Sequence, residues 1–409
     1  MRFFFRLLPI YHYLSLFIPY SHNNNIYRRF ITSFNYLCLA FKYIDQMSSP
    51  KFPKLSLSFH GELKKRISEY FKQSGKPTTG NFRLYFKALL LVLCFIGVYV
   101  HLVFFTPPVL LAIAECVLLG CLTAAIGFNV MHDGAHGSFS PNKWVNNIAS
   151  NAASFLGASQ YMWKTKHNVI HHTYTNIHGV DDDIEAKPFL RLCDDQVHYK
   201  IHRYQHFYFW AAYSLLYMYW VFVSDYTKYF SLKIGSTPLR KMTFSEHFFF
   251  WFYKVSNAFI FVFLPIYLLG FLPWIIGFLA MSLVAGFVLS IVFQLAHTVE
   301  HTHFPHADEE TGKMEDEWAI HQIKTTANFA TKNKLVSWLV GGLNFQVEHH
   351  LFPKISHVHY PAISKIIKKA CQEYGVQYIE YKRVRSAIAS HLAFLKAMGR
   401  RPGQFRVAH

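Results

Sequence analysis

Long apolar runs, separated by polar and basic stretches, dominate this chain of 409 residues. Four of the runs approach the roughly 20 residues that an α-helix needs to cross the hydrocarbon core of a bilayer. They lie at residues 86–106, 108–130, 248–269 and 273–296. The first two runs are joined by "TPP" and the last two by "GFLP", and both links are too short for anything but tight turns. The pattern therefore predicts two transmembrane helical hairpins, which together contain four spanning helices.

A fifth apolar stretch, "FYFWAAYSLLYMYWVFV" at residues 207–223, is rich in Tyr and Trp. These side chains favour the headgroup level of a membrane. If this stretch crossed the bilayer, the C-terminal part of the chain would lie on the opposite side. We therefore predict an interfacial helix, with a plain buried helix of a cytosolic cap as the alternative.

Composition supports a membrane protein, because 52% of the residues are hydrophobic and only 16% are charged. Soluble globular proteins carry about 25% charged residues. The net charge is +18, and the basic residues flank the apolar runs while the two tight turns carry none. Nucleic-acid binding is one interpretation of such a charge, but this placement favours anionic headgroups and control of topology. The positive-inside rule predicts that both termini and the region between the hairpins are cytoplasmic.

The chain also divides by composition. Residues 1–46 are rich in Phe, Tyr, Asn and Ile without a helical period, and "MSSPKFPKLSLSF" then begins at Met47 like a new start. We interpret residues 1–46 as an N-terminal extension from a misassigned start codon, with a targeting segment as the alternative. Residues 47–84 are predicted to be a basic cytosolic arm, residues 85–380 the main domain, and residues 381–409 a basic cytosolic tail.

Histidine is unusually frequent, with 25 residues, and three clusters stand out. They read "HDGAH", "HNVIHH" and "QVEHH", and they contain His132, His136, His167, His171, His172, Gln346, His349 and His350. On a helix, residues four apart share a face and residues three apart nearly do, so each cluster presents its side chains to one side. A single histidine is more often a surface or core residue than a ligand. Three such clusters on one predicted side of a membrane indicate a metal site.

Imidazole suits iron, zinc and copper. One zinc ion needs about four ligands, and the clusters offer more histidines than that, so we predict two metal ions. The six cysteines form no CxxC pair, which argues against a zinc ribbon or an iron–sulfur cluster. The clusters also lack the paired carboxylates of a soluble di-iron bundle. The predicted site is therefore built mainly from neutral nitrogen donors.

From about residue 85 to residue 380, the chain resembles the membrane-bound fatty acid desaturases, whose three histidine boxes have the forms HxxxH, HxxxHH and [H/Q]xxHH. The resemblance implies an all-α integral membrane protein, with two spanning hairpins, interfacial helices and a cytosolic helical cap that holds two iron ions. It implies O2-dependent desaturation of an acyl chain linked to CoA or to a membrane lipid. The glutamine in "GGLNFQVEHHLFP" is similar to that of front-end desaturases, which implies Δ5- or Δ6-type regioselectivity and a place for Gln346 in the metal site.

The family also places a histidine ligand near the end of the fourth spanning helix. In the stretch "QLAHTVEHTHF", His297 matches best, and His301 lies one turn further on the same face. We interpret His303 and His306 as loop residues. Three further polar residues lie between the proposed ligands, and they either hold imidazole tautomers or are ordinary polar residues of the cap. They are Asp133, Asn168 and Glu348.

The sequence contains no HPGG haem motif, so we expect electrons from a separate carrier, such as ferredoxin or cytochrome b5 with its reductase. A basic cytosolic face would suit an acidic carrier, and lipid headgroup binding is the alternative role for the same charges. Two other functions remain open. A histidine-box hydroxylase acting on a lipid or an alkane would share the ligands. A non-redox metal-binding receptor or transporter is the other, although a transporter would need ionisable residues at membrane depth, where the runs are largely apolar.

Overall fold

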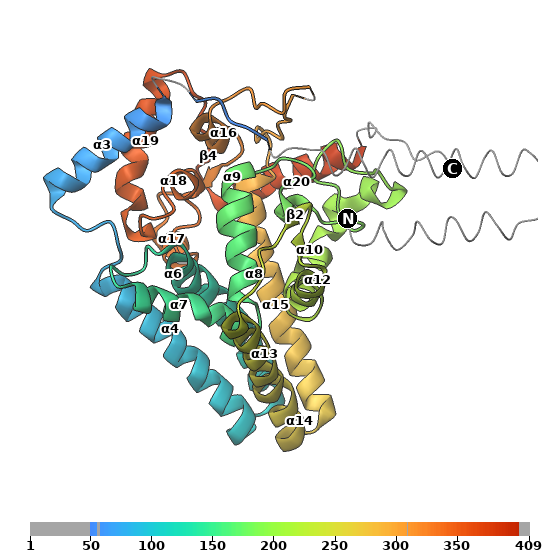
Figure 1. Cartoon of the computed structure of the whole chain (residues 1–409). Coiled ribbons are helices and arrows are strands. Elements are labelled where there is room, and N and C mark those ends of the chain that lie inside the picture. Colours follow the sequence, from blue (N-terminus) through green and yellow to red (C-terminus); the bar gives the residue numbers. More distant parts are fainter. Residues whose placement is uncertain (1–49, 55–57, 309, 401–409) are drawn as a thin grey trace, which may run out of the picture. The chain divides into compact units, whose positions relative to one another are not determined.

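The computed structural model describes residues 50–54, 58–308 and 310–400 (Figure 1). The predicted extension at residues 1–46 lies outside this part, as do the last nine residues of the predicted tail. Helices dominate the described residues, and the strands are short pairs of two residues each.

Within the described residues, four helical units are long and apolar enough to cross a membrane, so the prediction of an all-α multi-pass membrane protein is confirmed. The first two units contain α4 (Phe82–Val100), η1 (His101–Phe105), α5 (Val109–Ile126), η2 (Gly127–Met131) and α6 (His132–His136). The last two contain α13 (Phe244–Ala258), η7 (Phe259–Phe263), α14 (Leu264–Leu269) and the uninterrupted α15 (Phe271–His297). The second unit ends at His136, beyond the predicted residue 130, because a π-helical turn carries the helix on through the first histidine cluster.

The spanning helices share one apolar core. Leu91 and Phe95 of α4 pack there with Leu119 of α5 and Ala285 of α15. Large apolar side chains on the outer faces of the same helices are exposed, among them Leu93, which is 56% exposed. Such a continuous exposed apolar surface is expected where helices face lipid.

The region between the hairpins is a series of short helices and one strand pair. They are α7 (Lys143–Phe155), α8 (Gln160–Lys164), η3 (Thr165–His171), α9 (His172–Tyr174), η4 (Asp182–Ile184), η5 (Lys200–Tyr204), α10 (Gln205–Ser214), α11 (Leu216–Tyr219), η6 (Trp220–Ser224), α12 (Asp225–Ser231), β1 (Lys233–Ile234) and β2 (Thr237–Pro238). Strands β1 and β2 are antiparallel.

The stretch at residues 207–223 lies within α10, α11 and η6, and one of its faces packs on α15. The hydroxyl of Ser290 on α15 donates a hydrogen bond of 3.1 Å to the carbonyl oxygen of Tyr213. Its other face carries exposed aromatic side chains, including Phe207 and Trp210. The stretch is therefore half-buried against a spanning helix, and its placement at the headgroup level stays a prediction.

The remaining elements gather at the end of the spanning units where α15 finishes (Figure 1). They are α3 (Phe59–Ser74), α16 (Trp318–Lys324), β3 (Asn328–Phe329), α17 (Lys334–Leu339), α18 (Gln346–Leu351), η8 (His357–His359), α19 (Tyr360–Glu373), β4 (Glu380–Tyr381) and α20 (Val384–Arg400). Strands β3 and β4 are parallel. Leu63 and Ile67 of α3 pack with Ile363 and Ile367 of α19 in a second apolar core. This cap carries the third histidine cluster on α18.

Candidate metal centre

The three histidine clusters come from separate elements that meet at one end of the spanning units. The first cluster forms α6, which continues the second spanning unit, and the second lies on η3 and α9. The third forms α18, and His297 is the last residue of α15. The site therefore depends on tertiary packing, because no single element supplies a full ligand set.

The second cluster is π-helical and not α-helical as the spacing argument assumed. The backbone N–H of His172 bonds to the carbonyl oxygen of His167, five residues earlier. In this wider turn the Nε2 atoms of His167 and His172 lie 3.3 Å apart. His171 meanwhile faces His297, with ring centroids 4.8 Å apart. π-helical turns occur often at functional sites, and here the turn distributes neighbouring histidines to different parts of the centre.

Two glycines bring the third cluster close to the first. Gly341 has a φ of +60°, and a Cβ there would lie 2.4 Å from the carbonyl oxygen of Phe128. Phe128 lies on the turn before the first histidine cluster; the three clusters are called boxes 1, 2 and 3 below. Gly342 has a φ of +70°, and a Cβ there would lie 2.8 Å from Cβ of His357. Only glycine combines the left-handed backbone with so close an approach. The "GG" before "LNFQVEHH" therefore packs box 3 onto the second spanning unit.

A first donor group combines all three boxes. His132, His136, His167 and His349 each offer one ring nitrogen, and these atoms lie within 4.8 Å of one another. The rings of His132 and His349 have centroids 4.4 Å apart. Four imidazoles at this spacing can surround one cation.

A second donor group consists of His171, His297 and His350, whose ring nitrogens also lie within 4.8 Å of one another. The amide nitrogen of Gln346 lies 3.0 Å from Nε2 of His297 and 3.4 Å from Nε2 of His350. The glutamine therefore turns into this group and is not a spacer on the surface. The amide oxygen of Gln346 is buried and has no hydrogen-bond partner among the described residues.

His172 lies between the two groups. Its ring centroid is 4.8 Å from that of His136 in the first group and 4.4 Å from that of His350 in the second. The structure thus brings together all of the predicted site residues, namely His132, His136, His167, His171, His172, His297, Gln346, His349 and His350. His301, the alternative to His297, is exposed and lies outside both groups, as do His303 and His306.

Hydrogen bonds to Nδ1 hold the rings of the second group in one tautomer. Nδ1 of His171 lies 3.0 Å from Oδ2 of Asp181, and Nδ1 of His350 lies 2.7 Å from the amide oxygen of Gln322. Nδ1 of His297 lies 3.3 Å from the carbonyl oxygen of Thr325. Because these oxygens accept, each Nδ1 donates, and the lone pair of each ring is on Nε2. Nε2 of His297 and Nε2 of His350 lie next to the amide nitrogen of Gln346, whereas Nε2 of His171 has no partner among the described residues. The three Nε2 atoms are therefore the ones that a metal ion in this group would use.

The electrostatics favour neutral rings at most histidines of the site. Burial, together with the neighbouring imidazoles, lowers the pKa values of His167, His172, His349 and His350 well below the usual range. His171 is the exception: burial lowers its pKa, but the carboxylates of Asp181 and Asp183 more than offset this effect and raise the pKa overall. A neutral imidazole is the form that binds a metal ion.

The buried nitrogen atoms of the site fit metal ions. Several have no hydrogen-bond partner among the described residues. They are both ring nitrogens of His132, Nε2 of His136, His171 and His349, and Nδ1 of His172. Leaving a buried polar atom unpaired costs about 1–3 kcal/mol, so such atoms call for a missing partner. A neutral imidazole has one lone pair, so a cation would provide the partner for one nitrogen of each ring.

Three supporting residues had not been singled out by sequence reasoning. Asp181 lies in the acidic run "VDDD" after box 2, which was a usable signal. No signal in the sequence marks Gln322 or Tyr360. In the structure, the hydroxyl of Tyr360 lies 3.1 Å from Nδ1 of His349. They belong to α16 and α19, which reach the site only through the packing of the cap.

The polar residues between the ligands connect the boxes to their surroundings. Nδ2 of Asn168 donates a hydrogen bond of 2.9 Å to the carbonyl oxygen of Ala135, which joins box 2 to box 1. The carboxylate of Glu348 accepts hydrogen bonds from Asn328 at 2.7 Å and from Tyr378 at 2.6 Å. One carboxylate oxygen of Asp133 accepts hydrogen bonds from Ser356 and His357, outside the boxes, and its other oxygen lies 3.9 Å from Nδ1 of His132.

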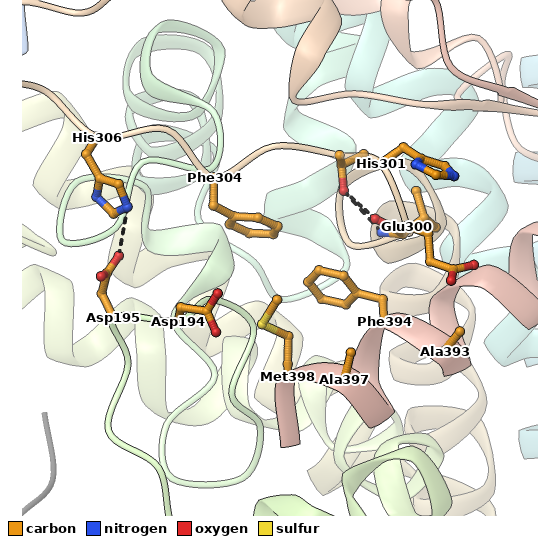
Figure 2. Close-up of a pocket in the computed structure, with 12 residues that line it drawn as sticks. Asp194, Asp195, Glu300, His301, Phe304, His306, Ala393, Phe394, Ala397 and Met398 are labelled. Carbon is orange, nitrogen blue, oxygen red and sulfur yellow. Dashed lines mark hydrogen bonds and ion pairs between the residues drawn. The ribbon is translucent and has the colours of Figure 1, made fainter. Parts of the chain in front are cut away.

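A cavity of about 360 Å³ lies just beyond the end of α15 (Figure 2). Phe304 and Phe394 stack there with ring centroids 5.5 Å apart, and His306 pairs with Asp195 at 3.3 Å. His301 also lines this cavity. None of its lining residues belongs to the two donor groups, so we place the chemistry in the histidine cluster and not in this cavity.

Comparison with known proteins agrees with this geometry. The family model described as fatty acid desaturase matches residues 106–382. The chain belongs to the fatty acid desaturase family. This desaturase is 38% identical over 349 residues to an sn-1 linoleoyl-lipid 6-desaturase of Synechocystis sp., a match that covers 84% of the chain and 96% of the relative.

Two further relatives are similar over most of their lengths. An sn-1 linoleoyl-lipid 6-desaturase of Arthrospira platensis is 34% identical, over 85% of the chain and 94% of the relative. An acyl-lipid (8-3)-desaturase of Physcomitrium patens is 33% identical, over 83% of the chain and 72% of the relative. This desaturase is therefore a membrane-bound oxidoreductase that acts on fatty acyl chains, and the receptor and transporter alternatives are set aside.

Proposed function

We propose that this desaturase holds two iron ions between its three histidine boxes and uses O2 to insert a double bond into the acyl chain of a membrane lipid. The observation that carries the proposal is the pair of adjacent donor groups with His172 between them. The first ion would be held by His132, His136, His167 and His349. The second would be held by His171, His297 and His350, with the amide oxygen of Gln346.

Iron with O2 supplies the oxidising power that acid–base side chains lack, because the C–H bonds of an acyl methylene are strong and non-polar. The reaction removes one hydrogen atom from each of two neighbouring carbons. With two external electrons and two protons, O2 becomes two molecules of water, and a C=C bond forms. The side chains position the ligands, because Asp181, Gln322 and Tyr360 hold imidazole rings in place. Burial of the donor groups keeps bulk water away from the metal centre.

The substrate and the position of the double bond are proposed from the relatives. Two of them are named for a linoleoyl-lipid substrate and a 6-desaturation. Together with the glutamine of box 3, these names favour a lipid-linked polyunsaturated chain and front-end, Δ6-type insertion over a CoA-linked substrate.

The charge of the chain is the basis for proposing the electron donor and the side of the membrane on which the metal centre lies. The chain carries a net charge of +18, and its basic residues flank the spanning units. By the positive-inside rule the cap and the donor groups face the cytoplasm. A basic cytoplasmic surface favours an acidic redox protein, such as ferredoxin or cytochrome b5 with its reductase, as the source of electrons.

The test is expression in a host that makes no polyunsaturated fatty acids and is supplied with linoleic acid. Mass spectrometry of double-bond derivatives should identify a new fatty acid with an added double bond at carbon 6, first in the phospholipid fraction after a short pulse. A hydroxylated product would instead identify a hydroxylase. A host that contains inserted protein and an electron donor but forms no new product would contradict the proposal.

A further inference from the structure

A buried chain of polar side chains runs from the first spanning unit to box 1. Lys87 of α4 is only 6% exposed, and its Nζ lies 3.1 Å from Nε2 of His357. On the other side of the ring, Nδ1 of His357 lies 3.0 Å from Oδ2 of Asp133, the residue after His132. The hydroxyl of Ser356 donates a hydrogen bond of 2.7 Å to the same carboxylate oxygen. His357 lies outside the three boxes and was not among the predicted site residues.

The two charged groups fix the orientation of the His357 ring. An ammonium group can only donate hydrogen bonds, and an ionised carboxylate can only accept them. Nε2 of His357 therefore accepts from Lys87, and Nδ1 carries the hydrogen and donates to Asp133. The other tautomer would direct its N–H at the ammonium group and its lone pair at the carboxylate, and a ring turned over would present C–H groups to both. Only one tautomer in one orientation satisfies both partners.

The same segment also reaches box 3. The short helix η8 leads directly into Tyr360, whose hydroxyl lies 3.1 Å from Nδ1 of His349. Residues 356–360 thus contact α6 through Asp133 and α18 through His349. His132 and His349 belong to the same donor group, with ring centroids 4.4 Å apart. The segment lies where it can set the separation between these two histidines.

We propose that His357 is a positioning residue for the first donor group. Lys87 holds its ring in one orientation, His357 in turn fixes Asp133 and with it the helix of box 1, and Tyr360 fixes His349. The inference rests on the proposed function, because the role is defined toward the ion bound by the first donor group. It makes a spanning-helix lysine part of the support of the metal centre.

The test uses the full-length protein, purified in detergent and stripped of metal. It is titrated with Co2+, whose visible absorption depends on its ligands. The wild-type protein should bind two Co2+ ions. In His357→Phe, one ion should bind about 10–100-fold more weakly with an altered spectrum, the loss typical for groups that orient ligands, while the other stays unchanged. His357→Asn keeps a donor near the position of Nδ1 and should recover most of the affinity.

The matched control is His359→Phe. His359 lies on the same short helix, is 7% exposed, and bonds through Nε2 to the carbonyl oxygen of Thr79 at 3.1 Å, without contact to box 1. This variant should keep both Co2+ ions with wild-type affinity. Wild-type affinity and spectrum in His357→Phe would overturn the inference, and so would equal weakening of both ions in His357→Phe and His359→Phe.

One further variant keeps the test decisive if His357→Phe does not fold. Lys87→Met removes the ammonium group and should weaken the same single ion, whereas a wild-type titration of Lys87→Met would overturn the inference. Failure of the proposed function looks different. In that case the wild-type protein itself would bind fewer than two Co2+ ions.

Discussion

The ring centroids of His132 and His349 lie 4.4 Å apart, although one residue lies in the last helix of a spanning unit and the other lies on a helix of the cap. Their nitrogen atoms fall in one donor group with those of His136 and His167. The membrane-spanning part and the cap must therefore pack correctly before this group exists.

Replacing a ligand should abolish desaturation without preventing insertion into the membrane. In His349→Ala the first donor group loses a nitrogen that no neighbour can replace, so product should fall by more than about 100-fold. Gas chromatography of host lipids at matched expression measures the effect. His301→Ala is the control, because His301 is exposed and lies outside both groups, and it should retain activity. Full activity in His349→Ala would remove this residue from the ligand set.

Gln346 should be a working part of the second donor group. Gln346→Ala removes the amide that lies 3.0 Å from His297 and should lower activity strongly. Gln346→Glu adds a negative charge beside the ion and should also lower turnover. Gln346→His restores the commoner form of the box with a shorter side chain, so we expect reduced activity with iron retained. Product and bound iron are measured for all three variants, and wild-type activity in Gln346→Ala would show that the glutamine is only a spacer.

Asp181 should matter through His171, in addition to the backbone N–H groups of Asn176 and Asp183 from which its carboxylate accepts hydrogen bonds. Asp181→Asn weakens the acceptor that holds Nδ1 of His171 and should cost about 10–100-fold in activity or metal affinity. Asp182→Asn is the matched control, because Asp182 pairs with Lys228 at 2.9 Å, on the outer side of the site. Iron content and product should remain near wild type in the control. Equal losses in both variants would show a general effect of the acidic run.

The hairpins could be predicted from the sequence because the bilayer itself imposes length and hydropathy on a helix. The box residues could be predicted because histidines at short spacing are rare without a metal. The grouping of the ligands could not, since it depends on how α6, η3 and α18 pack. The π-helical turn at residues 165–171 changes which neighbours face each other, and nothing in "TKHNVIH" signals it. Supports such as Gln322 reach the site only through tertiary contacts.

Gly341 should be needed for its close approach as well as for its backbone conformation. Alanine at a left-handed position costs about 1–2 kcal/mol, and this should be the whole effect in Gly375→Ala, where a Cβ would have nothing within 4 Å. In Gly341→Ala the Cβ would also lie 2.4 Å from Phe128, so box 3 must shift. Thermal unfolding and activity should both suffer more in Gly341→Ala. Similar behaviour of the two variants would show that the close contact is unimportant.

Residues 1–46 should be dispensable. They lie outside the described residues, and the prediction rests on the change of composition at Met47. A chain that begins at Met47 should insert and form the same product as the full-length chain, as judged by membrane fractionation and lipid analysis. Mislocalisation or loss of product would show that the extension is a targeting segment.

The metal content of the purified wild-type protein tests the central claim most directly. Two adjacent donor groups, both with buried nitrogen atoms that lack partners, predict two ions of iron in each chain. Elemental analysis of protein purified from cells grown in iron-sufficient medium should give close to two iron atoms per chain, with little zinc or copper. One metal ion per chain, or zinc in place of iron, would contradict the account.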